Sequence, residues 1–411
     1  MEDKKVKKVI VIAILISILL LGLTGVVSAQ ENIIKIGTAV SMTGHMAREG
    51  GLVKNGFEVW ADWTNRHGGI TAGGVNYKVE MIYLDDESDP VRGAKLTERL
   101  ITQDNVDFLF GPFSSAITFA TSAIAEKYKM ITIAPQSNAI KIFERGYEYI
   151  FSVLPPATEL LSPIAYMADG LNPRPEIVAI ISSNDLFPLS CAEGFRDKCE
   201  ELGFKVPFFE KYPPGSTDLS NLLTQAEGIN PDILVLSGYT GDAIMVNRQC
   251  KELNVNAKIF IAAEGVDIPD FTRELGNDAE YWFGATWWSQ NMNNTDTIFG
   301  STADYVQICK DYFGPDYEAR QHCATGSAAG SLLQLAIEKA DSIELEKVRE
   351  ALRSLDIELA TFPAVAFNEK GQNIKWQHPV MQVQNGKAVV VFPDSLKEKE
   401  PMYPTPEWQK R

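Results

Sequence analysis

Residues 108–139, FLFGPFSSAITFATSAIAEKYKMITIAPQSNA, decide the fold of this chain. The apolar runs Phe108–Phe110 and Met130–Ala134 are too short for helices and stop at turn residues, which indicates buried parallel strands. A helical pattern over about 116–127 joins them. Because parallel strands end at the same edge of a sheet, the polar residues after them share the edge where open α/β sheets bind ligands. These residues are Ser114, Ser115, Gln136, Ser137 and Asn138.

The two serines of this stretch have two interpretations. They precede the predicted helix, where unpaired N–H groups and the helix dipole favour an anion. They could equally be only N-caps, because serine is a preferred cap residue. The local sequence is compatible with both.

Strand and helix patterns alternate on both sides of this stretch. A first series runs from Ile33 to Ser152, and a second, after Pro155-Pro156, runs from Ile177 to Gly265. Such alternation predicts mostly parallel sheets with right-handed crossovers. We therefore expect two similar α/β halves, completed by later segments that do not form a third domain. The tail over 394–411 is rich in proline and charge, and we expect it to be loosely ordered.

The N-terminus has the pattern of an export signal. The basic start MEDKKVKK precedes an almost wholly apolar run over 9–27 and the small-x-small sequence Val27-Ser28-Ala29. We predict a signal peptide over 1–29 and an exported protein, periplasmic or at the cell surface. The apolar run is also long enough to serve as an uncleaved membrane anchor.

The composition favours binding over catalysis. A formal net charge of −16 argues against nucleic acid and anionic lipid as partners. The four histidines lie at no metal-ligand spacing, and nucleophile-elbow, P-loop and dinucleotide motifs are missing from the sequence. The acidic turn over 85–90 lacks the glycine and terminal glutamate of an EF-hand loop. We therefore expect no enzyme activity, no cofactor and no metal.

The cysteine count permits a disulfide in an exported chain. Five cysteines leave at least one unpaired. Cys191 and Cys199 lie about two turns apart on one predicted helix, too far apart to bridge. Cys309–Cys323 is the better pair because it would join two predicted helices.

An ordered set of segments resembles the type I periplasmic binding proteins of branched-chain amino acid ABC transporters. The segments are GHMAREGGLVKNGFEVWADWTNRHGGI, LDDESDPVRGAKLTERLI, FGPFSSA, IAPQSNA, SSNDLFPLSCAEGF, SGYTGDA and IAAEGVD. The resemblance implies an α/β fold of two doubly wound parallel-sheet lobes joined by three crossover strands, near 152–156, 285–289 and 362–367. Lobe one would comprise 32–153 plus 288–362, and lobe two 157–285 plus 366–393, with the ligand between them.

The resemblance also implies a ligand site built from both lobes. Ser115 matches the serine that binds an amino acid carboxylate, and Glu264 matches the acid that pairs with the α-ammonium. Further positions in matching motifs, with their neighbours, are Ser114, Gln136, Ser137, Asn138, Phe187, Tyr239 and Thr240. A zwitterion needs donors at one end and a carboxylate acceptor at the other. Charge-assisted bonds from both lobes would favour a closed clamp.

Two segments depart from the family pattern. Glu49, with Arg48 beside it, stands where relatives that bind aliphatic side chains carry an aromatic residue. Trp287-Trp288 replaces small residues near the second crossover. These residues predict a side-chain pocket that is polar or lined by aromatic rings, which argues against leucine-type specificity. Arg48 and Glu49 could instead form a solvated pair in a loop.

The resemblance implies an extracytoplasmic solute-binding protein that captures a small zwitterion, an amino acid, and delivers it to an ABC permease. The alternative is a clamp-type sensor, or a binding protein for an amide, a urea or an aromatic acid. An enzyme would need a nucleophile–base pair or a metal constellation, and the sequence contains neither pattern.

Overall fold

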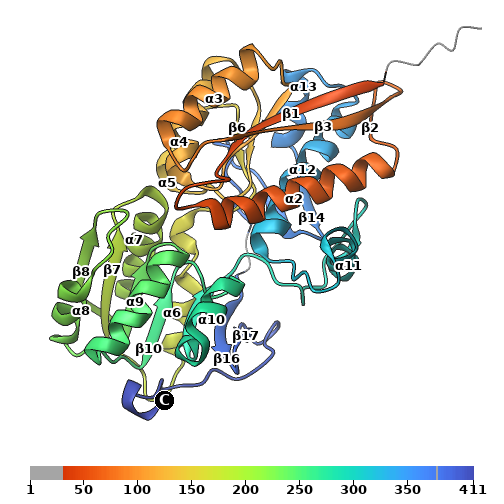
Figure 1. The fold of residues 1–411 in the computed structure, drawn as a ribbon. Helices are drawn as coiled ribbons and strands as arrows, with labels where there is room; N and C mark the ends of the chain where they lie inside the picture. Colours follow the sequence, from red (N-terminus) through yellow and green to blue (C-terminus); the bar gives the residue numbers. More distant parts are fainter. Residues whose placement is uncertain (1–30, 376–377) are drawn as a thin grey trace, which may run out of the picture. The chain divides into compact units, whose positions relative to one another are not determined.

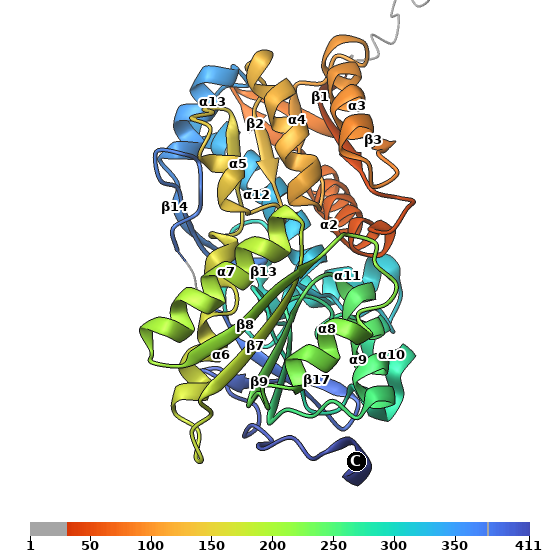
Figure 2. The same ribbon diagram turned by 90° about the vertical axis from the view of Figure 1, so that its left-hand side faces the viewer.

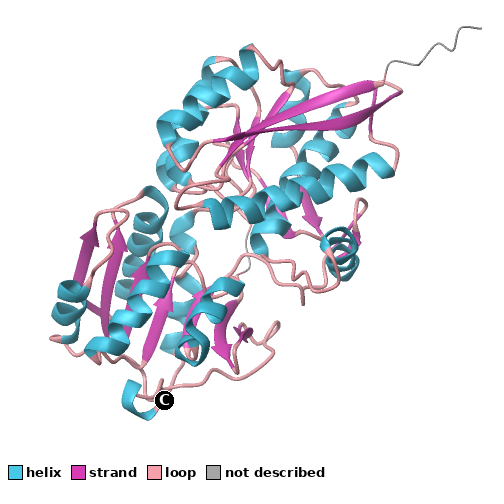
Figure 3. Cartoon of the chain, viewed as in Figure 1, coloured by secondary structure: helices cyan, strands magenta, loops and turns pink. Residues whose placement is uncertain are grey.

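Two large sheets carry the fold, each flanked by helices, which confirms the predicted α/β class (Figure 3). The computed structural model describes residues 31–375 and 378–411. The predicted signal peptide, residues 1–29, lies outside the described residues. None of the helices in the described part of the chain is both long and apolar enough to cross a bilayer.

The first sheet contains both strands that were predicted within residues 108–139. Its strands are β1 (Asn32–Val40), β2 (Ile70–Ala72), β3 (Val75–Asp85), β4 (Phe108–Phe110), β5 (Thr132–Ala134) and β6 (Ile150–Ser152). They lie in the order β2-β3-β1-β4-β5-β6. The ladders from β1 through β4 and β5 to β6 are parallel, as predicted. The accompanying helices are α2 (Ala47–Arg66), α3 (Pro90–Thr102), α4 (Ser115–Lys127) and α5 (Ile140–Phe143).

The second sheet repeats the pattern with a larger set of strands. They are β7 (Ile177–Ser183), β8 (Lys205–Tyr212), β9 (Ile233–Ser237), β10 (Ile259–Ala262), β11 (Trp282–Ala285), β16 (Val380–Gln384) and β17 (Lys387–Phe392). The order is β17-β16-β11-β10-β9-β7-β8. Strands β7 to β11 are parallel, and the antiparallel hairpin of β16 and β17 extends the sheet beyond β11.

Helices cover both faces of this second sheet. They are η1 (Ala157–Glu159), α6 (Ser162–Asp169), α7 (Leu186–Glu201), α8 (Ser220–Glu227), α9 (Thr240–Leu253), α10 (Pro269–Leu275) and η2 (Gly276–Ala279). Alternate residues of β7 enter different cores: Val178 and Ile180 pack with α7, whereas Ala179 and Ile181 pack with α8 and α9. Figure 2 shows these helices on opposite sides of the strands. Burial on both faces explains why the strands are continuously apolar.

A C-terminal segment returns to the first sheet. It contains β12 (Thr295–Asp296), β13 (Gly300–Ser301), α11 (Thr302–Phe313), α12 (Gln321–Ala340), α13 (Leu345–Arg353), β14 (Asp356–Leu359) and β15 (Phe362–Ala366). Helix α12 packs along α2 (Figure 1). A β-carbon at Gly56 would lie 2.0 Å from the carbonyl oxygen of Cys323, and one at Gly330 would lie 2.0 Å from the Trp60 ring. Only glycine permits this approach, which fixes the position of α2.

The chain passes between the two sheets three times within the described residues. It leaves the first sheet after β6, returns after β11 and joins the second sheet again at β16. Strand β15 pairs with β14, and Gln372 still bridges to Ser152 of β6. We propose that these passages separate two lobes, the first two passages lying near the limits expected from the sequence. The third passage then lies after Gln372, not at 362–367.

The C-terminal tail is packed against the second sheet, so the prediction of a loosely ordered tail is wrong. Trp408, in η3 (Trp408–Lys410), is buried, and its Nε1 donates a hydrogen bond to the carbonyl oxygen of Val255 at 2.8 Å. Its ring centroid lies 5.9 Å from that of Phe260 in β10. The proline- and charge-rich composition of the tail gave no sign that Trp408 packs against apolar residues of the second sheet.

The cysteines also differ from the expectation, because all five are free thiols. Cys309 of α11 and Cys323 of α12 are both buried, and each thiol shifts the pKa of the other. The two sulfurs are not covalently joined, and the Tyr305 hydroxyl lies 3.3 Å from Cys323 Sγ. The predicted Cys309–Cys323 disulfide is therefore absent from this structure.

Candidate functional site

A small cavity lies at the carboxyl ends of strands from both sheets. Its lining residues are Phe113, Ser114, Ser115, Gln136, Phe187, Tyr239 and Glu264. The segments after β4 and β5 supply the first four residues, and those after β7, β9 and β10 supply the others. All except Phe113 were predicted as ligand-binding residues. The structure thus collects most of the predicted site around one space.

The two serines have different roles at the start of α4. Ser114 is the N-cap, and its Oγ accepts hydrogen bonds from the N–H groups of Ala116 at 3.2 Å and Ile117 at 3.4 Å. Ser115 Oγ accepts a hydrogen bond from the Ala139 N–H at 3.3 Å. The Ser115 hydroxyl hydrogen has no acceptor among the described residues, so this group can still donate. The cap interpretation therefore suits Ser114, and the anion-binding interpretation suits Ser115.

The polar triplet after β5 is held largely by the protein itself. Gln136 lines the cavity, and its Nε2 donates to Thr325 Oγ1 of α12 at 2.6 Å. Ser137 Oγ contacts backbone carbonyl oxygens of the segment after β4 at 2.9 and 3.0 Å. Asn138 Nδ2 donates to the carbonyl oxygen of Pro155 at 2.7 Å. Ser137 and Asn138 are buried and are not among the lining residues of the cavity, although Asn138 Oδ1 accepts no hydrogen bond from the described residues.

Aromatic rings from both sheets meet in the cavity. The Tyr239 ring centroid lies 6.1 Å from that of Phe187 and 5.9 Å from that of Phe113. The Tyr239 hydroxyl donates to Asp185 Oδ2 at 2.8 Å. Burial, together with the Asp185 charge, raises the pKa of Tyr239 well above its usual value, so the phenol stays neutral. Thr240 is buried beside Tyr239 and is not part of the lining.

Glu264 is a buried acid in the cavity lining, and one of its oxygens has no hydrogen-bond partner among the described residues. The residue is 3% exposed, and its Oε2 accepts no hydrogen bond from the described residues. His322 Nε2 lies 3.7 Å away, but burial lowers the pKa of His322 to about 3, so this ring is neutral and forms no ion pair. Burial, and then the neighbouring acids Asp267 and Glu49, raise the pKa of Glu264 well above its usual value. A cation in the cavity would favour the ionised form.

Arg48 and Glu49 do not line this cavity, and they do not form a solvated pair with each other. Arg48 forms ion pairs with two acids of α10: its Nε lies 2.9 Å from Asp270 Oδ2, and its Nη2 lies 3.0 Å from Glu274 Oε1. Glu49, next to it on α2, is 2% exposed. These two sequence neighbours therefore have different surroundings: Arg48 reaches the second-sheet helix α10, whereas Glu49 is buried.

Trp287 belongs to the second passage between the sheets and is not part of the cavity lining. Its backbone N–H donates to Gln321 Oε1 at 2.9 Å. Its ring meets the His378 ring edge-on, with centroids 3.9 Å apart. The predicted role of Trp287 in ligand binding therefore has no contact with this cavity to support it.

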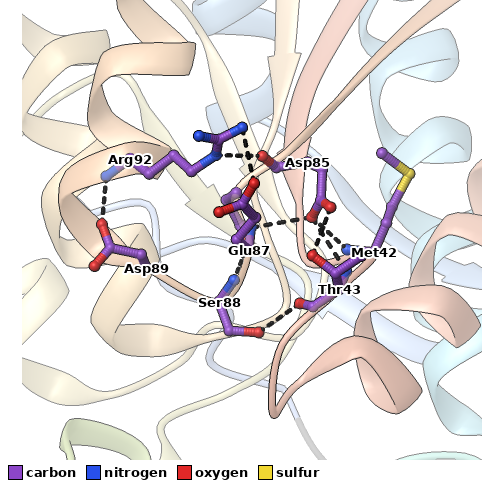
Figure 4. A network of polar contacts seen from close by, with 8 residues as sticks. Met42, Thr43, Asp85, Glu87, Ser88, Asp89 and Arg92 are labelled. Atoms are coloured by element: carbon purple, nitrogen blue, oxygen red, sulfur yellow. Dashed lines mark hydrogen bonds and ion pairs between the residues drawn. The ribbon is translucent and has the colours of Figure 1, made fainter.

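The loop before α2 is fixed by the acidic turn after β3 (Figure 4). Asp85 accepts hydrogen bonds from the N–H of Met42 at 3.0 Å and from the N–H and hydroxyl of Thr43 at 3.2 and 2.7 Å. Although burial opposes ionisation, these bonds lower the pKa of Asp85. Ser88 Oγ donates to the Thr43 carbonyl oxygen at 2.9 Å. The turn is thus a scaffold for the loop that leads to α2, and the described residues contain no group placed to hold a metal ion.

A second cavity is larger and shares no lining residue with the first. Its lining residues are Asp267, Trp288, Ser289, Gln290, Asn291, Ala319, Arg320, Gln321, Met381, Lys387, Ala388, Val389 and Glu398. It includes none of the segments after β4, β5, β7 and β9. The smaller cavity is the better candidate site, because it joins strand ends, a helix N-terminus and an acid without a hydrogen-bond partner.

Sequence reasoning missed three residues that shape the site. Phe113 directly precedes the predicted serines, so its position was a usable signal. Asp267 shares the segment after β10 with Glu264. His322 lies in the first turn of α12, and its ring centroid lies 5.5 Å from that of Phe113. No local pattern marks His322, because only the return of α12 to the first sheet places it here.

Comparison with known proteins agrees with this architecture. A family model described as "Periplasmic binding protein" matches residues 33–388. Leu/Ile/Val-binding protein homolog 7 of Brucella melitensis is 24% identical over 387 residues, 91% of this chain and 94% of its own. A leucine-, isoleucine-, valine-, threonine- and alanine-binding protein of Pseudomonas aeruginosa is 25% identical over 346 residues, 84% of this chain and 88% of its own.

Solved structures share the fold. A leucine binding protein from Thermotoga maritima aligns with a TM-score of 0.78 and 24% identity, covering 87% of this chain and 97% of its own. A solute binding protein from R. palustris in complex with benzoate aligns with a TM-score of 0.73 and 15% identity, covering 88% and 96%. These likenesses establish the two-sheet architecture, and ligand identity has to be argued from the cavity.

Proposed function

Because this chain belongs to the periplasmic binding protein family, we propose that it is an exported solute-binding protein that captures an amino acid and delivers it to an ABC permease. The observation that carries the proposal is the cavity that places Ser115 and Glu264 around one space. The family is made up of solute-binding proteins, so the proposed activity is capture and release, with no bond of the ligand made or broken.

The first-sheet side of the cavity suits the carboxylate of the ligand. Ser115 offers a hydroxyl hydrogen that has no other acceptor among the described residues, at the N-terminus of a helix whose dipole favours an anion. Ser114 keeps the first turn of α4 closed by capping it. Ser115 is therefore the hydroxyl donor that would bind the α-carboxylate of an amino acid.

The second-sheet side suits the ammonium group. Glu264 is a buried acid whose Oε2 accepts no hydrogen bond from the described residues, and leaving a buried acceptor unsatisfied is costly. An ammonium group would satisfy this oxygen and convert the acid to its charged form. The rings of Phe113, Phe187 and Tyr239 would cover the apolar part of the ligand.

Closure of the clamp follows from this division of roles. One ligand would bond to Ser115 from the first sheet and to Glu264 from the second, so it would bind tightly only when the two sides are together. A ligand shifts a conformational equilibrium by its difference in affinity between the two states. The proposed ligand would therefore stabilise the closed state, the form that a permease would recognise.

Glu264→Gln tests the proposal while preserving the shape of the side chain. We expect its affinity for the amino acid that binds best to fall at least about 30-fold, or ~2 kcal/mol, because a buried charged bond is replaced by a neutral one. Titration calorimetry with the standard amino acids gives the measurement. Glu252→Gln, on the exposed side of α9, makes the same charge change and should bind like the wild type. Equal affinity in Glu264→Gln and the wild type would remove Glu264 from the site.

An aromatic acid is a second candidate ligand, favoured by the three rings in the cavity and by the fold shared with a benzoate-binding protein. Benzoate carries no cation, so it would gain nothing from Glu264. The same variant separates the two candidates: Glu264→Gln should weaken an amino acid and strengthen benzoate, because the substitution removes a negative charge.

A further inference from the structure

His322 is a buried polar side chain whose ring makes no hydrogen bond within the described part of the chain. The residue is 0% exposed, and neither Nδ1 nor Nε2 has a hydrogen-bond partner there. Leaving a buried polar group unsatisfied is costly. A residue that only filled space beside Phe113 could be apolar and avoid this cost. The imidazole therefore needs a polar partner in another state of the site.

The first turn of α12 is held in place by the sequence neighbours of His322. Gln321 Oε1 accepts a hydrogen bond from the N–H of Trp287, in the second passage between the sheets, at 2.9 Å. Thr325 Oγ1 accepts one from Gln136 Nε2 at 2.6 Å, and Gln136 lines the small cavity. The backbone around His322 is thus tied to the cavity lining and to the second passage, while the ring nitrogens stay unsatisfied.

The unsatisfied ring lies beside the acid of the candidate site. His322 Nε2 is 3.7 Å from Glu264 Oε2, which likewise accepts no hydrogen bond from the described residues. This distance is slightly longer than a hydrogen bond, so two unsatisfied groups face each other just outside bonding range. They come from different sheets, because α12 packs along α2 whereas Glu264 follows β10.

From this geometry we propose that His322 is a positioning residue of the ligand site: its neutral imidazole donates a hydrogen bond from Nε2 to the Glu264 carboxylate when the ammonium group of the ligand ionises that acid. The inference rests on the proposed function and adds the residue that orients its acid. A carboxylate oxygen accepts more than one hydrogen bond, so Glu264 can receive the ligand and His322 together. Burial lowers the pKa of His322 to about 3, so the ring adds no second positive charge to the site. The bond would join the two sheets only in the ligand-bound state.

Two substitutions in the full-length protein separate hydrogen bonding from packing. His322→Gln keeps an amide donor and loses the ring, whereas His322→Phe keeps a ring beside Phe113 and has no donor. Titration calorimetry with the amino acid that binds best should place His322→Gln within about threefold of the wild type. His322→Phe should bind at least about tenfold more weakly, because a hydrogen bond to a buried charge is lost. The control His67→Phe, at an exposed position, should bind like the wild type. Wild-type affinity in His322→Phe, or a larger loss in His322→Gln than in His322→Phe, would overturn the inference.

The effect of His322 should also depend on Glu264. In a Glu264→Gln background, His322→Phe should weaken binding by less than about threefold, because the charge that strengthens the bond is already gone. An undiminished tenfold loss in that background would show that His322 acts elsewhere and would overturn the inference. A wild-type protein that binds no amino acid would instead refute the proposed function, so the two failures are distinguishable.

A measurement on the wild-type protein covers the case in which thermal melting shows that His322→Phe is not folded. In protein labelled with 15N-histidine, addition of the same amino acid should move the Nε2 resonance of one ring to that of a hydrogen-bonded N–H. This resonance should be missing from His322→Gln. If ligand addition at saturating concentration changes no histidine resonance, His322 does not bond to Glu264 and the inference is wrong.

Discussion

Arg48 offers the sharpest test of how the two sides of the site are held together. Its guanidinium joins α2 to Asp270 and Glu274 of α10, at 2.9 and 3.0 Å. These two helices accompany different sheets, so the ion pairs can form only when the two sides are in contact. We expect Arg48→Met to destabilise the closed state and weaken ligand binding, although Arg48 does not line the small cavity.

The magnitude follows from the exposure of the pairs. The Arg48 side chain is 32% exposed, and ion pairs of this kind contribute roughly 0.2–1 kcal/mol each. The substitution strands no buried acid, because Asp270 keeps Arg273 and Glu274 keeps Arg248. We therefore expect a total loss of about 1 kcal/mol, or about fivefold in affinity. Since salt screens partly exposed charges, the difference should shrink in 1 M salt.

Titration calorimetry with the amino acid that binds best provides the assay. The double variant Asp270→Asn with Glu274→Gln should copy Arg48→Met, because it removes the same pairs from the other side. Combining all three substitutions should add little, as expected for one interaction measured in a mutant cycle. A loss above a hundredfold in Arg48→Met, with no effect of the α10 variant, would show that Arg48 contacts the ligand directly and would refute this reasoning.

Two further predictions concern stability without ligand. Burial raises the pKa of Asp267 to about 6 despite the opposing effect of Arg320. The folded protein therefore keeps the Asp267 carboxyl protonated at pH values at which the unfolded chain has already lost that proton. The stability from this group is present below pH ~4 and is lost as pH rises through about 6. Asp267→Asn should therefore melt at a higher temperature than the wild type at pH 7, by the equivalent of about 3 kcal/mol of unfolding free energy. The difference should vanish near pH 4, and a difference that does not change with pH would contradict the proposed titration of Asp267. Trp408→Ala should lower the free energy of unfolding by about 3 kcal/mol in urea titrations, because Trp408 is buried. The control Lys410→Ala, at an exposed position, should lower it by almost nothing. Equal effects of the two substitutions would mean that Trp408 does not anchor the tail.

Much of the candidate site was predictable from local sequence. Short apolar runs that stop at small or polar residues indicated buried parallel strands, and parallel strands must end at one edge of their sheet. That rule alone places Ser115 after β4, Tyr239 after β9 and Glu264 after β10. The helix that begins at Ser115 was also visible, because a cap residue precedes an uninterrupted helical pattern.

Other features depended on contacts that no local pattern encodes. Arg48 and Glu49 are adjacent in sequence, yet Arg48 forms ion pairs with α10 and Glu49 is buried. Asn138 looked like a ligand contact, but its amide nitrogen is used by the carbonyl oxygen of Pro155. His322 enters the site only because α12 packs on α2 through glycine contacts.

The sequence by itself determined the strands, their direction and the polar residues at their ends, because these follow from the spacing of apolar and turn residues. Only the tertiary structure decided which polar groups are satisfied by the protein and which are left for a ligand. The physical reason is that satisfaction depends on partners far apart in the chain, such as Arg48 and Asp270, which meet only because α2 of the first sheet lies against α10 of the second.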